Sequence, residues 1–200
     1  MTDAPEQSHE QNHEHHHEHV DYGDAIRAFR GDKDAYLRTG SGSPLPPAER
    51  AGFAGLPYFD VDTALYFEGL VLEPYTGSEP TTFAIPTSDG KRRPTVRAGM
   101  FRFEVRAIEC VLTAYTFEHG EPGSVFVPFL DSTSGSVTYG AGRYLDLERE
   151  DDGTYILDFN LAYHPSCVYD ARFSCPLTPA ENRLSVRIEA GERLDEGHDG

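Results

Sequence analysis

The stretch FRFEVRAIECVLTAYTF, residues 101–117, carries the pattern of a β-hairpin. From Phe101 to Val105 every second residue is apolar and the residues between them are charged, which is the alternation of a half-buried strand. The alternation slips between Ala107 and Glu109, so we expect a turn or bulge there before the apolar run VLTAYTF. This stretch indicates a fold built on β-structure.

Further strand-like runs lie on both sides of it, from Tyr58 onward. Turn signals such as GEPG and DSTSG separate these runs. About nine short strands of this kind predict a mainly β domain, either a β-sandwich or a closed barrel. The expected strands outside the hairpin are 65–72, 82–86, 95–98, 124–130, 137–147, 154–162 and 183–190.

The two ends of the chain differ from this central part. Residues 1–20 are rich in His and Glu, hold six of the nine histidines and are expected to be a disordered tail. Residues 21–190 are expected to form one domain, which begins with one or two short helices over 21–38, interrupted near Gly31, and a brief helical turn at 47–51. Residues 191–200 look like an acidic C-terminal tail.

The charge of the chain excludes some partners. Its net charge is −17, and only Lys33 and Lys91 among its 17 basic residues are lysines. High acidity with scarce lysine predicts a protein suited to concentrated salt, as in a halophilic cytosol, although an ordinary acidic protein has the same signature. We expect no nucleic-acid partner, because phosphate binding needs a positive surface. The lack of an 18-residue apolar run and of a signal peptide predicts a soluble, cytoplasmic protein without a membrane partner.

The run VFVPFLDSTSGSVTYGAGRYLDLE, residues 125–148, gathers polar residues between apolar ones. Asp131 lies in a polar turn, and Arg143 stands between Tyr139 and Tyr144 after two glycines that suggest a bulge or a close backbone approach. An arginine in this setting suits a bidentate clamp for a carboxylate or phosphate ligand. It also suits an internal ion pair, and the candidate partners are Asp131, Asp146, Asp158 and Glu181.

A second polar group lies in DFNLAYHPSCVYDARFSCP, residues 158–176. Asp158 and Asn160 share one face of an expected strand, an arrangement suited to a pocket. Four interpretations compete for Cys167 and Cys175: a disulfide, a metal site with His164, a nucleophilic thiolate with His164 as its base, and two buried structural thiols. Cys110 is most simply a small core residue.

The third group is PLTPAENRLSVRIEAGE, residues 176–192, where Glu181 and Asn182 precede the last expected strand. Glu181 suits an acid/base role, and both residues also suit the termination of a turn and the satisfaction of its backbone groups. The sequence has no glycine-rich phosphate loop, no serine nucleophile elbow, no HExxH motif and no nucleotide fingerprint, so it names no cofactor.

Three runs together resemble a known family: SPLPPAERAGFAGLPYF, the run 125–148 and LDFNLAYHPSCVYDARFSCPLTPAENRLSVRIEAGE. They are similar to the bacterial and archaeal domain of unknown function 1684, over about residues 22–192. The resemblance implies no activity. His164 stands where the family usually has asparagine, which weakens every role that depends on a histidine. The positions that match the family pattern are Phe129, Asp131, Thr133, Gly135, Tyr139, Gly142, Arg143, Tyr144, Asp158, Phe159, Asn160, Tyr163, Pro165, Cys167, Cys175, Pro179, Glu181 and Asn182.

The sequence therefore predicts a small-molecule binding module in which Arg143 engages an anionic group. The ligand-binding candidates are Asp131, Tyr139, Arg143, Asp158, Asn160 and Glu181, and the metal candidates are Cys167, Cys175 and His164. An alternative is a hydrolase-like enzyme that uses Glu181 or Asp131 as its acid/base group, with or without a metal. A third possibility is an internal ion-pair network with a purely structural role.

Overall fold

The hairpin expected at residues 101–117 forms the centre of the larger of two sheets. In the computed structural model, which describes residues 21–195, strand β3 (Arg92–Val105) pairs with β4 (Ile108–Phe117) in antiparallel register, with Val105 opposite Ile108. The two turn residues, Arg106 and Ala107, have φ values of 51° and 63°. A two-residue turn with both φ positive matches the twist of the strands that it joins. The predicted break in the alternation is this turn.

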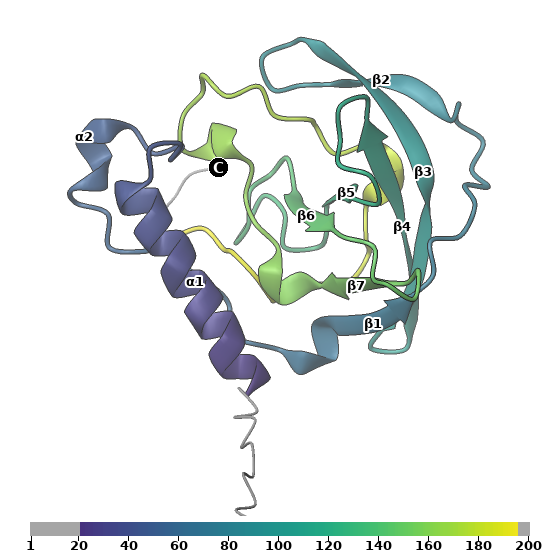
Figure 1. Cartoon of the computed structure of the whole chain (residues 1–200), viewed down its shortest axis with the longest axis horizontal. Coiled ribbons are helices and arrows are strands. Elements are labelled where there is room, and N and C mark those ends of the chain that lie inside the picture. Colours follow the sequence, from purple (N-terminus) through teal and green to yellow (C-terminus); the bar gives the residue numbers. More distant parts are fainter. Residues whose placement is uncertain (1–20, 196–200) are drawn as a thin grey trace, which may run out of the picture.

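Seven strands in the described part of the chain make two antiparallel sheets (Figure 1). The larger sheet has the order β2-β3-β4-β5-β6, and the smaller one pairs β1 with β7. The chain is thus mainly β, as predicted, and neither sheet closes into a barrel. The remaining strands are β1 (Tyr66–Leu70), β2 (Thr82–Pro86), β5 (Val125–Phe129), β6 (Arg143–Leu147) and β7 (Tyr155–Asp158).

The helices are few. Helix α1 (Tyr22–Thr39) is continuous through Gly31, where an interruption was expected, and α2 (Pro47–Arg50) is the predicted short turn. Figure 1 shows α1 lying beside the sheets. Short 3-10 helices span Thr63–Leu65, Phe159–Leu161, Ser166–Val168 and Ala180–Asn182. Within residues 21–195, no helix has the length and apolar character needed to cross a bilayer.

Several expected strands differ from the structure. Residues 95–98 and 101–105 belong to one strand, β3, because the register shift between Arg97 and Gly99 lets pairing continue, and Arg106 lies in the turn. Of residues 137–147 only 143–147 are in a strand, since the preceding segment forms tight turns. Residues 183–190 alternate between exposed and buried like a strand, but they lie outside the named strands.

The main core lies between the sheets and takes in this last segment. Its fully buried members include Phe101, Leu112, Val127 and Leu157. The C-terminal segment, defined here as residues 183–192, adds four apolar side chains to the same core, namely Leu184, Val186, Ile188 and Ala190.

The body of the protein extends past residue 190. The sequence predicts an acidic tail from residue 191 onward, whereas Gly191 and Glu192 are both buried. A Cβ atom on Gly191, whose φ is +76°, would lie 2.5 Å from the carbonyl oxygen of Ala162. This close approach favours glycine. The expected tail at residues 1–20 and the last five residues lie outside the described part of the chain.

Candidate functional site

Arg143 is enclosed in the protein and bound by it. The residue opens β6 and has no exposed surface. Its guanidinium donates to the carbonyl oxygens of Ile188 (2.7 Å), Glu192 (3.2 Å) and Ala190. Nη2 also lies 3.5 Å from Oδ1 of Asp131. Burial lowers the pKa of Arg143 to about 10, so the group stays charged at neutral pH.

Asp131 completes this cluster from the other side. Its carboxylate accepts the backbone N–H of Ile188 (2.8 Å) and of Thr133 (3.1 Å), and the hydroxyl of Thr133 (2.9 Å). In an extended chain, the N–H and carbonyl groups of every second residue point to the same edge, as those of Ile188, Ala190 and Glu192 do here. Asp131 and Arg143 therefore pair an edge of the C-terminal segment as a neighbouring strand would.

This geometry changes the expected role of Arg143. The predicted clamp requires a guanidinium that a ligand can reach, whereas this one has no exposed surface and is bonded to protein acceptors on both terminal nitrogens. The other interpretation, an internal ion pair with Asp131, is the arrangement that the structure contains.

Asp158 and Asn160 form a second, separate cluster at the end of β7. The strand stops at Asp158, and Asn160 lies in a 3-10 helix, so the expected shared strand face does not form. Asp158 accepts the N–H of Asn160 (2.9 Å) and the hydroxyl of Tyr22 (2.8 Å). The Asn160 side chain bonds both the N–H and the carbonyl of Asp62. These contacts fasten the start of α1 and the loop before β1 to β7.

Glu181 belongs to a third cluster, on β3 and β4. Its carboxylate lies 2.7 Å from Nη2 of Arg97 and accepts the hydroxyl of Tyr115 at 2.9 Å. Burial raises the pKa of Glu181, but hydrogen bonds from its backbone, Arg97 and Tyr115 outweigh burial and leave the pKa below its ordinary value. A lowered pKa makes Glu181 a weak general base. Asp131, the other candidate for this role, is 3% exposed, and its carboxylate accepts hydrogen bonds from five donors.

Among the metal candidates, His164 contacts a buried glutamate and Tyr139, whereas Cys167 and Cys175 contact each other. The Nε2 atom of His164 accepts the N–H of Tyr139 (3.3 Å), and its Nδ1 lies 3.7 Å from Oε2 of Glu192. The backbone N–H of Cys167 donates to Sγ of Cys175 at 3.3 Å. Within residues 21–195, no group of three or more His, Cys, Asp and Glu side chains is placed to hold a metal ion. The three metal candidates therefore do not form a ligand set there.

Glu192 is the buried functional group that the sequence reasoning missed. It is 1% exposed, forms an ion pair with Lys33 of α1 (2.5 Å) and accepts the N–H of His164 (2.7 Å) and the hydroxyl of Tyr169 (3.2 Å). The apolar alternation that runs up to Ala190 is the signal that could have placed it in the body, because two more residues continue the same extended segment.

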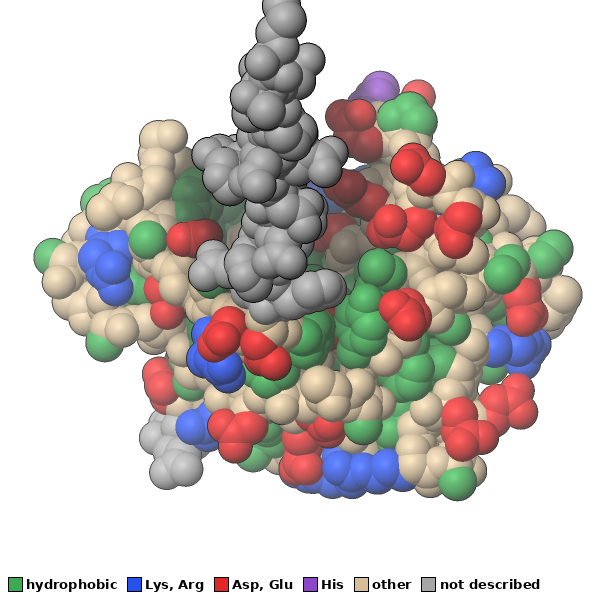
Figure 2. All heavy atoms as spheres, turned by 60° about the horizontal axis from the view of Figure 1, so that its bottom comes forward, with side chains coloured by type: hydrophobic (Ala, Val, Ile, Leu, Met, Phe, Trp, Pro, Cys, Tyr) green, Lys and Arg blue, Asp and Glu red, His purple; other side chains and the backbone are tan. Residues whose placement is uncertain are grey.

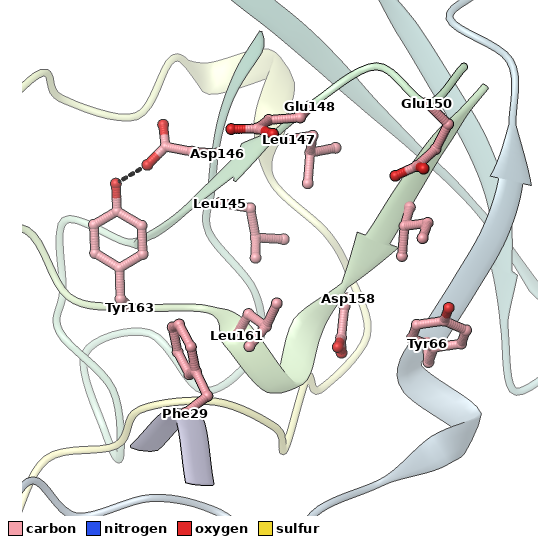
Figure 3. Close-up of a pocket in the computed structure, with 11 residues that line it drawn as sticks. Phe29, Tyr66, Leu145, Asp146, Leu147, Glu148, Glu150, Asp158, Leu161 and Tyr163 are labelled. Carbon is pink, nitrogen blue, oxygen red and sulfur yellow. Dashed lines mark hydrogen bonds between the residues drawn. The ribbon is translucent and has the colours of Figure 1, made fainter. Parts of the chain in front are cut away.

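An open cavity lies between β6 and β7, and Figure 3 shows the side chains that point into it. We call it the β6–β7 cavity. Each of these strands is the last in its sheet, so the cavity occupies the gap between two sheet edges. It measures about 470 Å³, and Asp158 is a predicted site residue in its wall. Its lining comprises Phe29, Tyr66, Leu145, Asp146, Leu147, Glu148, Glu150, Ile156, Asp158, Leu161 and Tyr163.

The lining of the β6–β7 cavity is mostly apolar, and all of its charged side chains are acidic. Seven of its side chains are aliphatic or aromatic, four are carboxylates and none is Lys or Arg. Figure 2, in which the bottom of Figure 1 is turned toward the viewer, shows acidic side chains beside exposed hydrophobic ones. Asp146, Glu148 and Glu150 recur at every second residue, a spacing that turns side chains of an extended chain to one side. That spacing is the sequence signal that was overlooked.

Phe29 and Tyr163 are two of the aromatic residues that line this cavity. Phe29 reaches it from α1 and is 47% exposed (Figure 3). Tyr163 donates a hydrogen bond to Asp146, and Lys33 lies 4.8 Å from the centre of the Tyr163 ring. Burial and the Asp146 carboxylate raise the pKa of Tyr163, so the side chain stays a neutral donor.

A second cavity, of about 460 Å³, lies between the α2 region and the end of the described chain. Its lining includes His164, Val168 and Tyr169 together with Phe53 and Leu56. Unlike the β6–β7 cavity, it has charges of both signs in its wall, because Arg193 lies there with Glu49 and Asp195.

Comparison with known proteins supplies a family without an activity. Residues 51–193 match the sequence model of a family described as "Protein of unknown function (DUF1684)". The chain is also similar to an uncharacterized protein of Haloarcula marismortui whose solution structure was determined by NMR, with 36% identity and a TM-score of 0.65. That similarity covers 87% of this chain and 95% of the other. No curated protein matches the chain.

Proposed function

Because the chain belongs to the DUF1684 family, whose description gives no activity, we propose from its geometry that it is a small-molecule binding module, and that its site is the β6–β7 cavity. One observation carries the proposal: a cavity of about 470 Å³ has apolar walls, four carboxylates and no basic residue in its lining. Small-molecule sites commonly have this volume and combine apolar walls with a few polar groups.

The charge of the lining selects the class of ligand. Carboxylates in an apolar cleft attract a cation and repel an anion, since the low-dielectric walls weaken screening. Aromatic faces add attraction for an organic cation. Phe29 from α1 and Tyr66 from β1 supply such rings in the lining (Figure 3). We therefore assign the site an amphipathic ligand with an apolar body and an ammonium group.

This ligand differs in charge from the one that the sequence suggested. The anionic ligand depended on an accessible Arg143, and the side chain is enclosed. We keep the proposal of a small-molecule binding module, but we place its binding site at Asp146, Glu148 and Glu150 instead of Arg143. Asp158 belongs both to the site predicted from the sequence and to the lining of this cavity.

Three matched probes test the proposal: 4-phenylbutylamine, 4-phenylbutanol and 4-phenylbutyrate, which share one apolar body and carry charges of +1, 0 and −1. Titration calorimetry at 0.1 M salt is expected to give the amine an affinity about tenfold above that of the alcohol, which corresponds to one favourable charge contact. The butyrate is expected to bind least. Equal affinities for all three, or tightest binding of the butyrate, would refute the proposed ligand class.

Variants locate the binding. The double variant Asp146→Asn/Glu148→Gln keeps the size of both side chains and is expected to remove the preference for the amine. Glu104→Gln is the matched control, because Glu104 is an exposed carboxylate on β3 outside the cavity. Loss of the preference in the control as well would show that overall charge, and not this cavity, causes it.

A further inference from the structure

Cys167 and Cys175, the two cysteines of the 158–176 run, are positioned by different parts of the fold. Cys175 is 7% exposed and is fixed to the segment that follows β2: its N–H donates to Oγ of Ser88 (3.0 Å) and its carbonyl accepts the Ser88 N–H (2.8 Å). The next residues continue this attachment, because the N–H of Leu177 donates to the carbonyl of Pro86 at 2.8 Å. Cys175 is thus held by the larger sheet.

Cys167 lies on a short 3-10 helix and is half-buried. Its N–H donates to Sγ of Cys175 at 3.3 Å, which places the two residues in direct contact across a loop of seven intervening residues. Both cysteines are free thiols. The third, Cys110, is buried in the main core and bonds the carbonyl of Ile108, so it is not part of this pair.

We propose that Cys167 and Cys175 form a reversible dithiol–disulfide site that a small disulfide of the glutathione type oxidises. The direct contact supplies the proximity, the attachment of Cys175 to the sheet limits the motion needed for bonding, and the partial exposure of Cys167 gives an external oxidant access to one sulfur.

The two thiols differ in their roles in the exchange. The thiolate of Cys167 attacks the external disulfide RSSR, a Cys167–SR bond forms, and RS⁻ leaves and takes up the proton that Cys167 released. Cys175 then loses its proton and attacks Sγ of Cys167, which forms the Cys167–Cys175 bond and releases the second RSH. Two thiols are oxidised and one RSSR is reduced to two RSH.

The order follows from access and acidity. Burial raises the pKa of Cys175 to about 11, so few Cys175 side chains are thiolates at neutral pH. Cys175 is poorly placed to attack an external disulfide, but it is well placed to resolve one that forms on its neighbour. Oxidation would close a nine-residue ring that carries Val168 and Tyr169, two residues in the wall of the second cavity.

Thiol mapping on the full chain tests the proposal. Reduced protein is equilibrated in buffers of glutathione and its disulfide with a chelator, quenched, alkylated and analysed by mass spectrometry. The expected product has one protected pair, mapped by peptides to residues 167 and 175, with Cys110 alkylated. Excess dithiothreitol added to the native protein is expected to restore all three thiols.

Variants test the order of attack. Cys175→Ser is expected to accumulate a glutathione adduct on Cys167, at a level about tenfold above that of the wild type, because the resolving thiol is missing. Cys167→Ser is expected to form a glutathione adduct on Cys175, at a rate about tenfold below that of adduct formation on Cys167 in Cys175→Ser. Cys110→Ser is the matched control and keeps the 167–175 disulfide.

The wild-type map decides the proposal even if a variant does not fold. Three alkylated thiols after exposure to the oxidising buffer, a disulfide that includes Cys110, a persistent glutathione adduct on the wild type, or a disulfide that resists excess dithiothreitol would each overturn it.

Discussion

At the scale of single residues, the enclosed charges hold backbone groups of distant segments. Arg143 binds three carbonyls of the C-terminal segment, and Glu192 of that segment binds back to Lys33 and His164. A buried backbone group without a hydrogen-bond partner is destabilising. These side chains therefore supply the hydrogen bonds that a neighbouring strand would otherwise make. A buried charge that loses its partner is more costly still.

Substitution of Arg143 by lysine tests this role. Lysine keeps the charge but lacks the planar fork, so it cannot reach three carbonyls and Asp131 together. We expect Arg143→Lys to lower the free energy of unfolding by about 2–4 kcal/mol. Urea denaturation measures the change. The control, Arg187→Lys, lies on the same segment with an exposed ion pair to Glu189, and it is expected to cost less than about 0.5 kcal/mol.

A stable Arg143→Lys protein would contradict the structural role. Unchanged unfolding together with lost affinity for 4-phenylbutyrate would restore the anion clamp in its place. The two roles are separable in this way because one predicts a change in folding and the other a change in binding.

The residue types of this cluster were visible in the sequence, but most of their partners were not. Asp131 and Arg143 stand out because charged residues between apolar strands need compensation. The acceptors of Arg143 are main-chain carbonyls 45–49 positions away, and every residue has such a carbonyl. The acidic cavity was missed for another reason: Asp146 and Glu148 look like ordinary solvent-facing residues until β7 and α1 are placed opposite them.

At the scale of elements, the C-terminal segment is extended and buries one of its faces without belonging to a named strand. Its alternation predicted a strand correctly in conformation, with Leu184 and Val186 turned to the core. Its pairing with residues 130–132 is limited to an isolated parallel bridge, in which Leu184 N–H donates to the Leu130 carbonyl, and a bond from Ser132 N–H to the Val186 carbonyl. Sequence alternation reports burial and not pairing, so it could not distinguish a strand from this segment.

Two truncations test where the folded body ends. Removal of residues 191–200 deletes Glu192, leaves Lys33 and the His164 N–H without that partner, and takes one carbonyl from Arg143. We expect this truncation to lower the free energy of unfolding by about 3 kcal/mol or more. Removal of residues 195–200 keeps all of these contacts and is expected to change it by less than about 0.5 kcal/mol.

Urea unfolding of both proteins beside the full chain gives the comparison. If both truncations are neutral, Glu192 contributes nothing to the fold and the body ends at residue 190. If both destabilise equally, residues 195–200 hold contacts of their own.

At the scale of the whole molecule, acidity is the dominant property. The chain carries 34 acidic and 17 basic residues, and four carboxylates converge on the β6–β7 cavity. Like charges on a compact body repel one another and destabilise it in dilute buffer. Salt reduces the range of this repulsion, because the Debye length falls from about 10 Å at 0.1 M to about 3 Å at 1 M.

We therefore expect the melting temperature to rise by about 5–10 °C between 0.1 M and 1 M KCl, since 1 kcal/mol corresponds to roughly 2–4 °C for a chain of this size. Scanning calorimetry measures the rise.

In the Asp146→Asn/Glu148→Gln variant two of the cavity carboxylates are neutral, so this protein is expected to melt higher at 0.1 M and to gain less from salt. Glu104→Gln again controls for a single exposed charge. A continued rise above 1 M reports salt exclusion from the surface, because screening is by then nearly complete. A melting temperature that stays level or falls up to 1 M would contradict adaptation to concentrated salt.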